Sequence, residues 1–192
     1  MDHFIGIDLG GTNTKVGVTD GRGAVIARRS VPTGARGGPD AVIEVMASAA
    51  RAVAADAGLG LKEVAGIGVG TPGPIDLAAG VVRAAPNLPG WKNVPLRDSL
   101  AAATGVAVVL ENDANAAAYG EYWAGAGGDE AVEHLVMLTL GTGIGSGLIV
   151  DGRLIHGGFG VGAETGHMII HPGGRRCGCG QHGCLEAYAA AS

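Results

Sequence analysis

Apolar and polar positions along the chain form blocks that predict strands interleaved with helices. The apolar run FIGIDL at residues 4–9 ends in glycines. TKVGVTD at 14–20 and GAVIARRSV at 23–31 follow as two more strand-like blocks, joined by a DGRG turn. Pro39 and Asp40 then open a helical pattern whose apolar residues recur on one side as far as Gly58.

The later blocks continue this alternation. VAGIGVG at 64–70 and VAVVL at 106–110 are typical of buried strands, and PLRDSLAAATG at 95–105 predicts a short helix between them. ENDANAAAYGEYWAGAG at 111–127 predicts a turn that leads into a helix, and HLVMLTLGTGIGSGLIVDG at 134–152 predicts two strands around a glycine turn. Strands that alternate with helices indicate an α/β fold.

One strand–turn–strand unit occurs twice. FIGIDLGGTNTKVGVTDGR at 4–22 aligns without a gap with LVMLTLGTGIGSGLIVDGR at 135–153, and Gly10 then meets Gly141. Chance similarity between glycine-rich hairpins is the alternative, but the equal length and the shared closing triplet DGR favour duplication. Two copies predict two similar lobes, each presenting a glycine turn to a shared cleft.

Composition restricts the class of protein. The 37 glycines and 47% hydrophobic residues suit a globular protein with many tight turns. The net charge is −5 and there is no basic stripe or aromatic platform, which argues against nucleic acid as a partner. No apolar run approaches the roughly 20 residues of a membrane helix, and the sequence does not open on a secretion leader. We therefore expect a cytoplasmic protein without a membrane partner.

The cysteines of the chain lie together in the segment RRCGCGQHGCLE: Cys177, Cys179 and Cys184. An odd number cannot complete a disulfide framework, and thiols in a reducing cytosol stay free, catalytic or metal-bound. The C-x-C-x4-C spacing supplies three soft ligands for a structural Zn²⁺ ion, with free thiols as the weaker alternative. The apolar run at 168–170 suggests a strand that returns toward the cysteines. Spacing alone leaves the fourth ligand open between His167 and His171.

Both glycine turns have the composition of an anion-binding loop, because glycines let backbone N–H groups approach a ligand closely. Neither turn is followed by the GKS or GKT of a Walker loop, and neither opens a helix as a dinucleotide fingerprint does. The pair predicts a nucleotide phosphate site at Gly10, Gly11, Thr12 and Asn13 and at Gly141, Thr142 and Gly143. Asp8, a charge within an apolar strand, is placed to orient a hydrated magnesium ion. Its alternative role is a hydrogen bond to the adjacent turn.

Polar residues follow the strand VAVVL directly. Glu111, Asn112 and Asp113 stand at its carboxyl end, where open α/β sheets bind ligands. Asp113 suits either a helix N-cap or a general base that accepts a hydroxyl proton during phosphoryl transfer. The two phosphate turns favour the base, with Asn112 bonded to the acceptor. Further polar groups near the cysteines indicate a sugar as the acceptor: Glu164, His167 and Glu186.

These motifs together resemble the ROK family (repressors, open reading frames and sugar kinases) of the actin-like ATPase superfamily, and above all its ATP-dependent bacterial glucokinases. IDLGGTNTK and LGTGIGSGLIVDG resemble the two phosphate motifs of the family, and LENDANAAAYGE resembles its catalytic segment. HGGFGVGAETGHM followed by CGCGQHGCLE resembles the zinc and sugar signature. The phosphate motifs fit the wider superfamily, whereas the zinc and sugar signature is highly specific.

The resemblance implies an actin-like (ribonuclease H-like) α/β fold with residues 1–111 as a small lobe and 112–192 as the first part of a larger one. It implies Asp113 as the general base, ATP and Mg²⁺ as cofactors, and a structural zinc ion on His167 and the three cysteines. The hexose ligands would be Asn87 in PNLPGW, Asn112, Glu164, His167 and Glu186. A homodimer and a protein longer than this chain are also implied, so that the activity of these 192 residues alone does not follow.

Other functions stay open on the sequence. A family kinase for fructose, mannose, allose or N-acetylmannosamine differs from a glucokinase by one or two hydroxyl contacts, although PNLPGW and the three polar groups near the cysteines favour glucose. A sugar-sensing regulator would carry a winged helix before the first phosphate motif, where only three residues precede Phe4. A zinc-stabilised interaction module would tolerate the loss of Asp113. The cysteine cluster favours ATP over polyphosphate as the phosphate donor.

Overall fold

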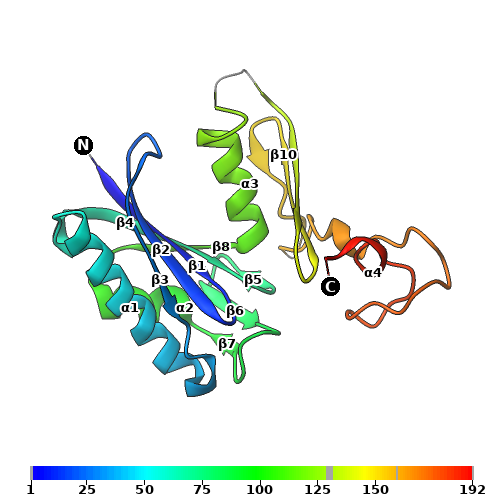
Figure 1. Cartoon of the computed structure of the whole chain (residues 1–192), viewed down its shortest axis with the longest axis horizontal. Coiled ribbons are helices and arrows are strands. Elements are labelled where there is room, and N and C mark those ends of the chain that lie inside the picture. The colour runs from blue at the N-terminus through cyan, green and yellow to red at the C-terminus, as the bar shows by residue number, and fades with distance from the viewer. Residues whose placement is uncertain (1, 129–131, 159, 192) are drawn as a thin grey trace. The chain divides into compact units, whose positions relative to one another are not determined.

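The computed structural model describes residues 2–128, 132–158 and 160–191, which form two compact units, Met1–Asp113 and Ala114–Ser192 (Figure 1). The lobe boundary expected from the sequence, between residues 111 and 112, lies within β8 (Val108–Asn112), two residues before the division between these units, and stays a prediction. Within the described residues, no helix is long and apolar enough to cross a membrane.

A five-stranded sheet forms the centre of the first unit, in the order β3-β2-β1-β4-β8. The three strands predicted at the start of the chain are the antiparallel β1 (His3–Leu9), β2 (Asn13–Asp20) and β3 (Val25–Pro32). β4 (Val64–Thr71) and β8 (Val108–Asn112) extend the sheet in parallel with β1. The carboxyl ends of β1, β4 and β8 therefore share one edge, which carries several of the predicted site residues.

Two helices cover one face of this sheet, α1 (Gly38–Asp56) and α2 (Leu96–Thr104) (Figure 1). Apolar residues alternate along β1 because every second side chain of a strand points to the same face, and here that face packs against the helices. α1 has Pro39 in its first turn, as predicted. The shared core includes Ile5, Ile7, Leu9, Val42, Met46 and Leu100.

An ion pair joins β3 to the end of α1. The guanidinium of Arg29 donates two hydrogen bonds to the carboxylate of Asp56, one of them 2.7 Å from Nη2 to Oδ1. The guanidinium lowers the pKa of Asp56 below its ordinary value of 3.8. Both side chains are partly exposed, so the pair contributes modestly to stability.

The sequence did not reveal a second, small sheet, in which β5 (Ile75–Asp76), β6 (Val81–Ala84) and β7 (Lys92–Val94) lie in that order. Strands of two to four residues are too short to show a periodic pattern. The loop between β6 and β7 carries Asn87, and the buried side chain of Trp91 anchors this loop in the core.

The second unit contains a three-stranded sheet in the order β11-β10-β9. β9 (Leu135–Leu140) and β10 (Ile144–Val150) are the predicted strands around the second glycine turn, and β11 (Arg153–Leu154) adds a short edge. Helix α3 (Asp113–Ala124) packs on β10. A Cβ at Gly147 would overlap the Cβ of Ala118 in α3, so this close approach requires glycine.

The predicted repeat is present as two antiparallel hairpins, but its gapless alignment is wrong in the second half. Leu9 pairs with Thr14 across the four turn residues 10–13, whereas Leu140 pairs with Ile144 across the three residues 141–143. The shorter turn shifts β10 by one residue relative to β2. Turn length sets the register of a hairpin, and a comparison of letters alone does not reveal it.

Two local predictions also need correction. The apolar run at 168–170 is not a strand, because no neighbouring strand pairs with it among the described residues. It follows the 3₁₀ helix η3 (Thr165–His167) and contributes a single bridge, between Ile169 and Cys184. The turn expected from residue 111 is absent too, since β8 runs through Asn112 and α3 starts at the next residue.

Candidate functional site

The first glycine turn, residues 10–13, is held by hydrogen bonds from the chain just beyond β3. The hydroxyl of Thr33 donates to the carbonyl oxygen of Gly10 at 2.7 Å, and its backbone N–H donates to that of Thr12 at 2.9 Å. Thr14 and Thr33 are both fully buried, and their hydroxyl oxygens lie 2.9 Å apart. The turn backbone is therefore held in place by hydrogen bonds within the first unit.

Asn87 lies against this turn. A Cβ at Gly11 would be 3.0 Å from both the Cβ and the backbone oxygen of Asn87, so the two loops are in close contact. The Asn87 side chain itself is exposed. A predicted sugar ligand and a predicted phosphate turn are thus neighbours within the first unit.

Asp8 faces Lys15, its partner across the β1–β2 ladder, with 3.4 Å between Oδ2 and Nζ. Both side chains are more than half exposed, and such pairs contribute little to stability. The predicted role of Asp8 toward hydrated magnesium stays a prediction.

Asn112 and Asp113 stand where the parallel strands end. Asn112 pairs with Thr71 at the end of β4, and the backbone N–H of Asn112 donates to the carboxylate of Glu111 at 2.9 Å. Asp113 is the first residue of α3 and is exposed. A carboxylate in the first helical turn interacts favourably with the helix dipole. The strand end and the helix start therefore present Asp113 to solvent at the sheet edge that was predicted to bind ligand.

The second glycine turn, residues 141–143, is tied to the short helix α4 (Glu186–Ala189) in the second unit. Glu186 accepts a hydrogen bond from the backbone N–H of Ile144 at 2.9 Å through Oε2. The backbone N–H of Ala191 donates to the carbonyl oxygen of Gly141, also at 2.9 Å. One predicted sugar ligand, Glu186, is thus bonded to the strand that leaves a predicted phosphate turn.

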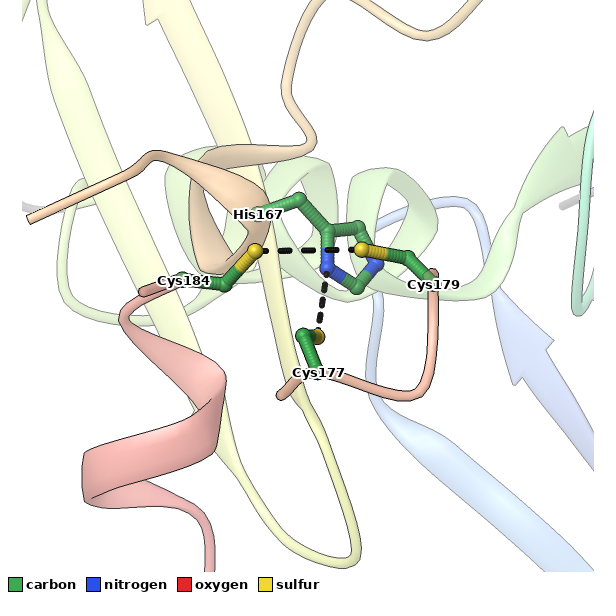
Figure 2. Close-up of side chains that lie close together, drawn as sticks. All are labelled: His167, Cys177, Cys179 and Cys184. Atoms are coloured by element: carbon green, nitrogen blue, oxygen red, sulfur yellow. Dashed lines mark hydrogen bonds between the residues drawn. The ribbon is translucent and has the colours of Figure 1, made fainter. Parts of the chain in front are cut away.

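The four predicted metal ligands come together, as Figure 2 shows: His167, Cys177, Cys179 and Cys184. Their ligand atoms all lie within 4.8 Å of one another. His167 Nδ1 is 3.6 Å from the Cys177 sulfur, and the sulfurs of Cys179 and Cys184 are 3.7 Å apart. His171 instead contacts the hydroxyl of Tyr188, at 3.1 Å from Nδ1, and is not part of the cluster.

The environments of the three thiols differ. Burial raises the pKa of the Cys184 thiol to about 12. A backbone hydrogen bond from Gln181 lowers the pKa of the exposed Cys179. A metal that binds these thiols displaces their protons, so binding and pH are coupled.

Two carboxylates lie next to this cluster. Glu164 Oε2 is 4.0 Å from His167 Nε2, the ring nitrogen that faces away from Cys177. The Cys177 thiol donates to Glu186 Oε1 at 3.5 Å. The three residues predicted to contact a sugar from the second unit therefore surround one local centre.

Some residues that build these sites were not identified from the sequence. Thr33 fixes the first turn, and Ser146 and Thr165 hold the segment that contains Glu164 and His167. Each is a small hydroxyl residue, and its role depends on contacts about 20 residues away along the chain. Only a three-dimensional structure brings those partners together.

Comparison with known proteins identifies the class. Residues 4–192 match the sequence profile of the ROK family, and the chain belongs to this family. The glucokinase of Thermotoga maritima is 45% identical over 189 residues, which cover 98% of this chain and 57% of that protein. The chain thus spans little more than half the length of this curated relative.

Solved structures give the same result. The ROK hexokinase from Thermus thermophilus has a TM-score of 0.84 and 44% identity, covering 98% of this chain and 60% of that one. A ROK family glucokinase from Streptomyces griseus, in complex with glucose and AMPPNP, has a TM-score of 0.83 and 39% identity, covering 98% and 57%. These likenesses confirm the mixed α/β fold of the actin-like class. The zinc knuckle within that fold stays a prediction.

Proposed function

We propose that the protein is an ATP-dependent kinase that phosphorylates glucose on its 6-hydroxyl. The observation that supports this most is the arrangement of Glu164, His167 and Glu186 around one four-donor cluster, in a chain 45% identical to a glucokinase. Because the chain covers 57% of that relative, the proposal concerns the protein as a whole and not these residues in isolation.

The donor set fits a zinc ion. One imidazole nitrogen and three sulfurs are the ligands of a closed structural zinc site, at about 2.0–2.3 Å from the metal. A tetrahedron of that size spaces its donors by roughly 3.3–3.8 Å. The spacings of 3.6 and 3.7 Å in the cluster agree with this. Zinc would hold the ends of the Cys177–Cys184 loop together and would take no part in the reaction.

The knuckle would also orient two sugar ligands. With Nδ1 of His167 directed at the cluster, Nε2 is the nitrogen left for a sugar hydroxyl, and Glu164 lies beside it. A deprotonated Cys177 has no proton to donate, so Glu186 Oε1 would lose its present donor and become free to accept a hydroxyl. Asn87 and Asn112 of the first unit would complete the hexose ligands.

The remaining residues would then act on the phosphate and the proton. Backbone N–H groups of residues 10–13 and 141–143 would hold the phosphates of ATP, and Asp8 would orient the hydrated Mg²⁺ ion. Asp113 would accept the proton of the 6-hydroxyl while that oxygen bonds to the γ-phosphorus and the bond to the β–γ bridging oxygen breaks. Positioning and charge stabilisation supply most of the catalysis in this reaction.

The test is ATP-dependent formation of glucose 6-phosphate by the wild type and by Asp113→Asn, with Asp98→Asn as a matched control. Asp98 is an exposed carboxylate on α2 that forms an ion pair with its neighbour Arg97. We expect Asp113→Asn to lower kcat by about 10²–10⁴-fold, the usual contribution of a general base, and Asp98→Asn to retain wild-type kcat. Equal turnover by the two variants would contradict the role of Asp113.

The same assay with fructose, mannose, allose and N-acetylmannosamine, and with polyphosphate in place of ATP, tests the choice of acceptor and donor. Glucose and ATP should give the highest kcat/KM. We also propose a homodimer located in the cytoplasm. A monomer mass by light scattering at micromolar concentration would contradict the dimer.

A further inference from the structure

The hydroxyl of Ser146 is the centre of a buried hydrogen-bond cluster in the second unit. Its side chain lies on β10 and is only 4% exposed. The hydroxyl donates to the carbonyl oxygen of Ala163 and accepts from Thr165 twice, from the backbone N–H at 3.1 Å and from the side-chain hydroxyl at 2.6 Å. One donor and two acceptor positions are the full capacity of a hydroxyl, so Ser146 is saturated.

These bonds bracket a proposed sugar ligand. Ala163 and Thr165 are the chain neighbours of Glu164, so the backbone on both sides of this carboxylate is bonded to one atom of β10. The next residue, Gly166, lies so close to β10 that an added Cβ would overlap the carbonyl oxygen of Ile144. His167 ends the same short helix, and its N–H donates to the carbonyl oxygen of Glu164 at 3.1 Å.

The internal repeat shows that the hairpin does not need a hydroxyl at this position. In the second hairpin, Ser146 pairs with Leu138, and in the first, Val16 pairs with Ile7. Leu138 and Ile7 are counterparts in the aligned repeat, so Ser146 occupies the place of Val16. Val16 is 3% exposed and belongs to the apolar core. Because the equivalent position of the first hairpin is apolar, the Ser146 hydroxyl is not needed to form the hairpin. We attribute its presence to the hydrogen bonds that it makes with Ala163 and Thr165.

We propose that Ser146 is a positioning residue for sugar binding, which holds Glu164 and His167 in place through Ala163 and Thr165. This proposal rests on the proposed sugar kinase function. Without the hydroxyl, the carbonyl oxygen of Ala163 and the N–H of Thr165 keep their 2.8 Å bond to each other but lose the bonds that tie them to β10, so the segment is free to move relative to the strand. The contacts of Glu164 and His167 with a bound sugar would weaken equally in the ground state and the transition state, which raises KM and leaves kcat unchanged.

The test compares Ser146→Ala and Ser146→Val with the wild type, and uses Ser30→Ala, an exposed serine on β3, as the matched control. Both Ser146 variants should raise KM and Kd for glucose about 5–30-fold, the effect of losing one or two buried hydrogen bonds. The kcat and the KM for ATP should stay within about twofold. Thr165→Val, which removes the hydroxyl but keeps the backbone N–H, should give a smaller increase, and Thr165→Ser should restore the wild-type value.

Amide hydrogen exchange provides a readout that does not depend on turnover. In Ser146→Ala, exchange should accelerate at residues 164–167 and stay unchanged in β1 and β2. Unchanged glucose affinity in folded, active Ser146→Ala would overturn the proposal, as would a parallel loss of affinity for ATP and glucose. If the wild type neither binds nor phosphorylates any hexose, the proposed function fails and this proposal fails with it. An active wild type with an unaffected variant refutes the role of Ser146 alone.

Discussion

Substituting Gly147 by alanine should displace the helix that begins with Asp113. The added Cβ would overlap the Cβ of Ala118 and would lie 3.1 Å from the carbonyl oxygen of Ala114. Carbon atoms in contact are about 3.5–4.0 Å apart, so α3 has to withdraw by roughly 1 Å or more. Ala118 has no flexible atoms that could move aside. Overpacking of this kind costs about 1–3 kcal/mol of unfolding free energy.

The displacement should also affect turnover, because Asp113 is on the same helix. A shift of about 1 Å in a catalytic group can lower the rate roughly 10²-fold. The assays are urea unfolding, followed by far-UV circular dichroism, and kcat for glucose phosphorylation. Gly120→Ala is the matched control, since Gly120 lies on α3 with nothing near its added Cβ. This control should gain up to about 1 kcal/mol from helix propensity.

A second substitution tests whether steric overlap between the new Cβ and Ala118 causes the loss of stability and turnover. In the double variant Gly147→Ala, Ala118→Gly, the methyl group that blocks the new Cβ is gone, and kcat should return toward the wild-type value. Stability should recover only in part, since glycine inside a helix costs about 1 kcal/mol. Wild-type stability and kcat in Gly147→Ala alone would refute the packing argument.

Two further predictions concern the ion pair on the first unit and the metal. Asp56→Asn should lower Tm slightly at pH 7, and this difference should shrink as the pH falls below 3.8, because the folded-state pKa of Asp56 lies below 3.8 and the ion pair is lost as pH falls through that folded-state value. A Tm difference that does not shrink as the pH is lowered would contradict this. Purified protein should contain about one zinc ion by mass spectrometry, and Cys184→Ser should lose it, as should wild type treated with a strong chelator. Both should melt at a lower temperature than the zinc-loaded wild type, whereas equal zinc content in Cys184→Ser would exclude this residue as a ligand.

The sequence predicted the longer elements well because their periods extend over many residues. The strands of the β1–β2 hairpin and helix α1 repeat their apolar positions often enough for one face to be recognised. β5 and β7 have two and three residues and offer no such repetition. The run at 168–170 is apolar but pairs through a single bridge. It was predicted as a strand because apolar residues alone do not reveal whether a partner strand is present.

The grouping of the candidate metal ligands could be predicted in outline for a different reason. Metal ligands and phosphate turns have distinctive residue types at short spacings, and the cluster of His167 with the three cysteines needs only residues 167–184. The hydrogen bonds that surround this cluster could not be predicted from the sequence. The bond from Ile144 to Glu186 joins residues that are 42 positions apart, and the second phosphate motif, which contains Ser146, did not reveal that this hydroxyl bonds to Ala163 and Thr165.

The four donors of the cluster lie within 18 consecutive positions, from 167 to 184. The sheet of the first unit, in contrast, requires a much longer stretch of chain. It is complete only when β8, which ends at Asn112, pairs with β4. Closing a loop of about ten residues takes roughly 10–100 ns and costs little entropy compared with longer loops. During synthesis on the ribosome, this segment can therefore adopt its local structure as soon as it leaves the exit tunnel, whatever the length of chain still to be added.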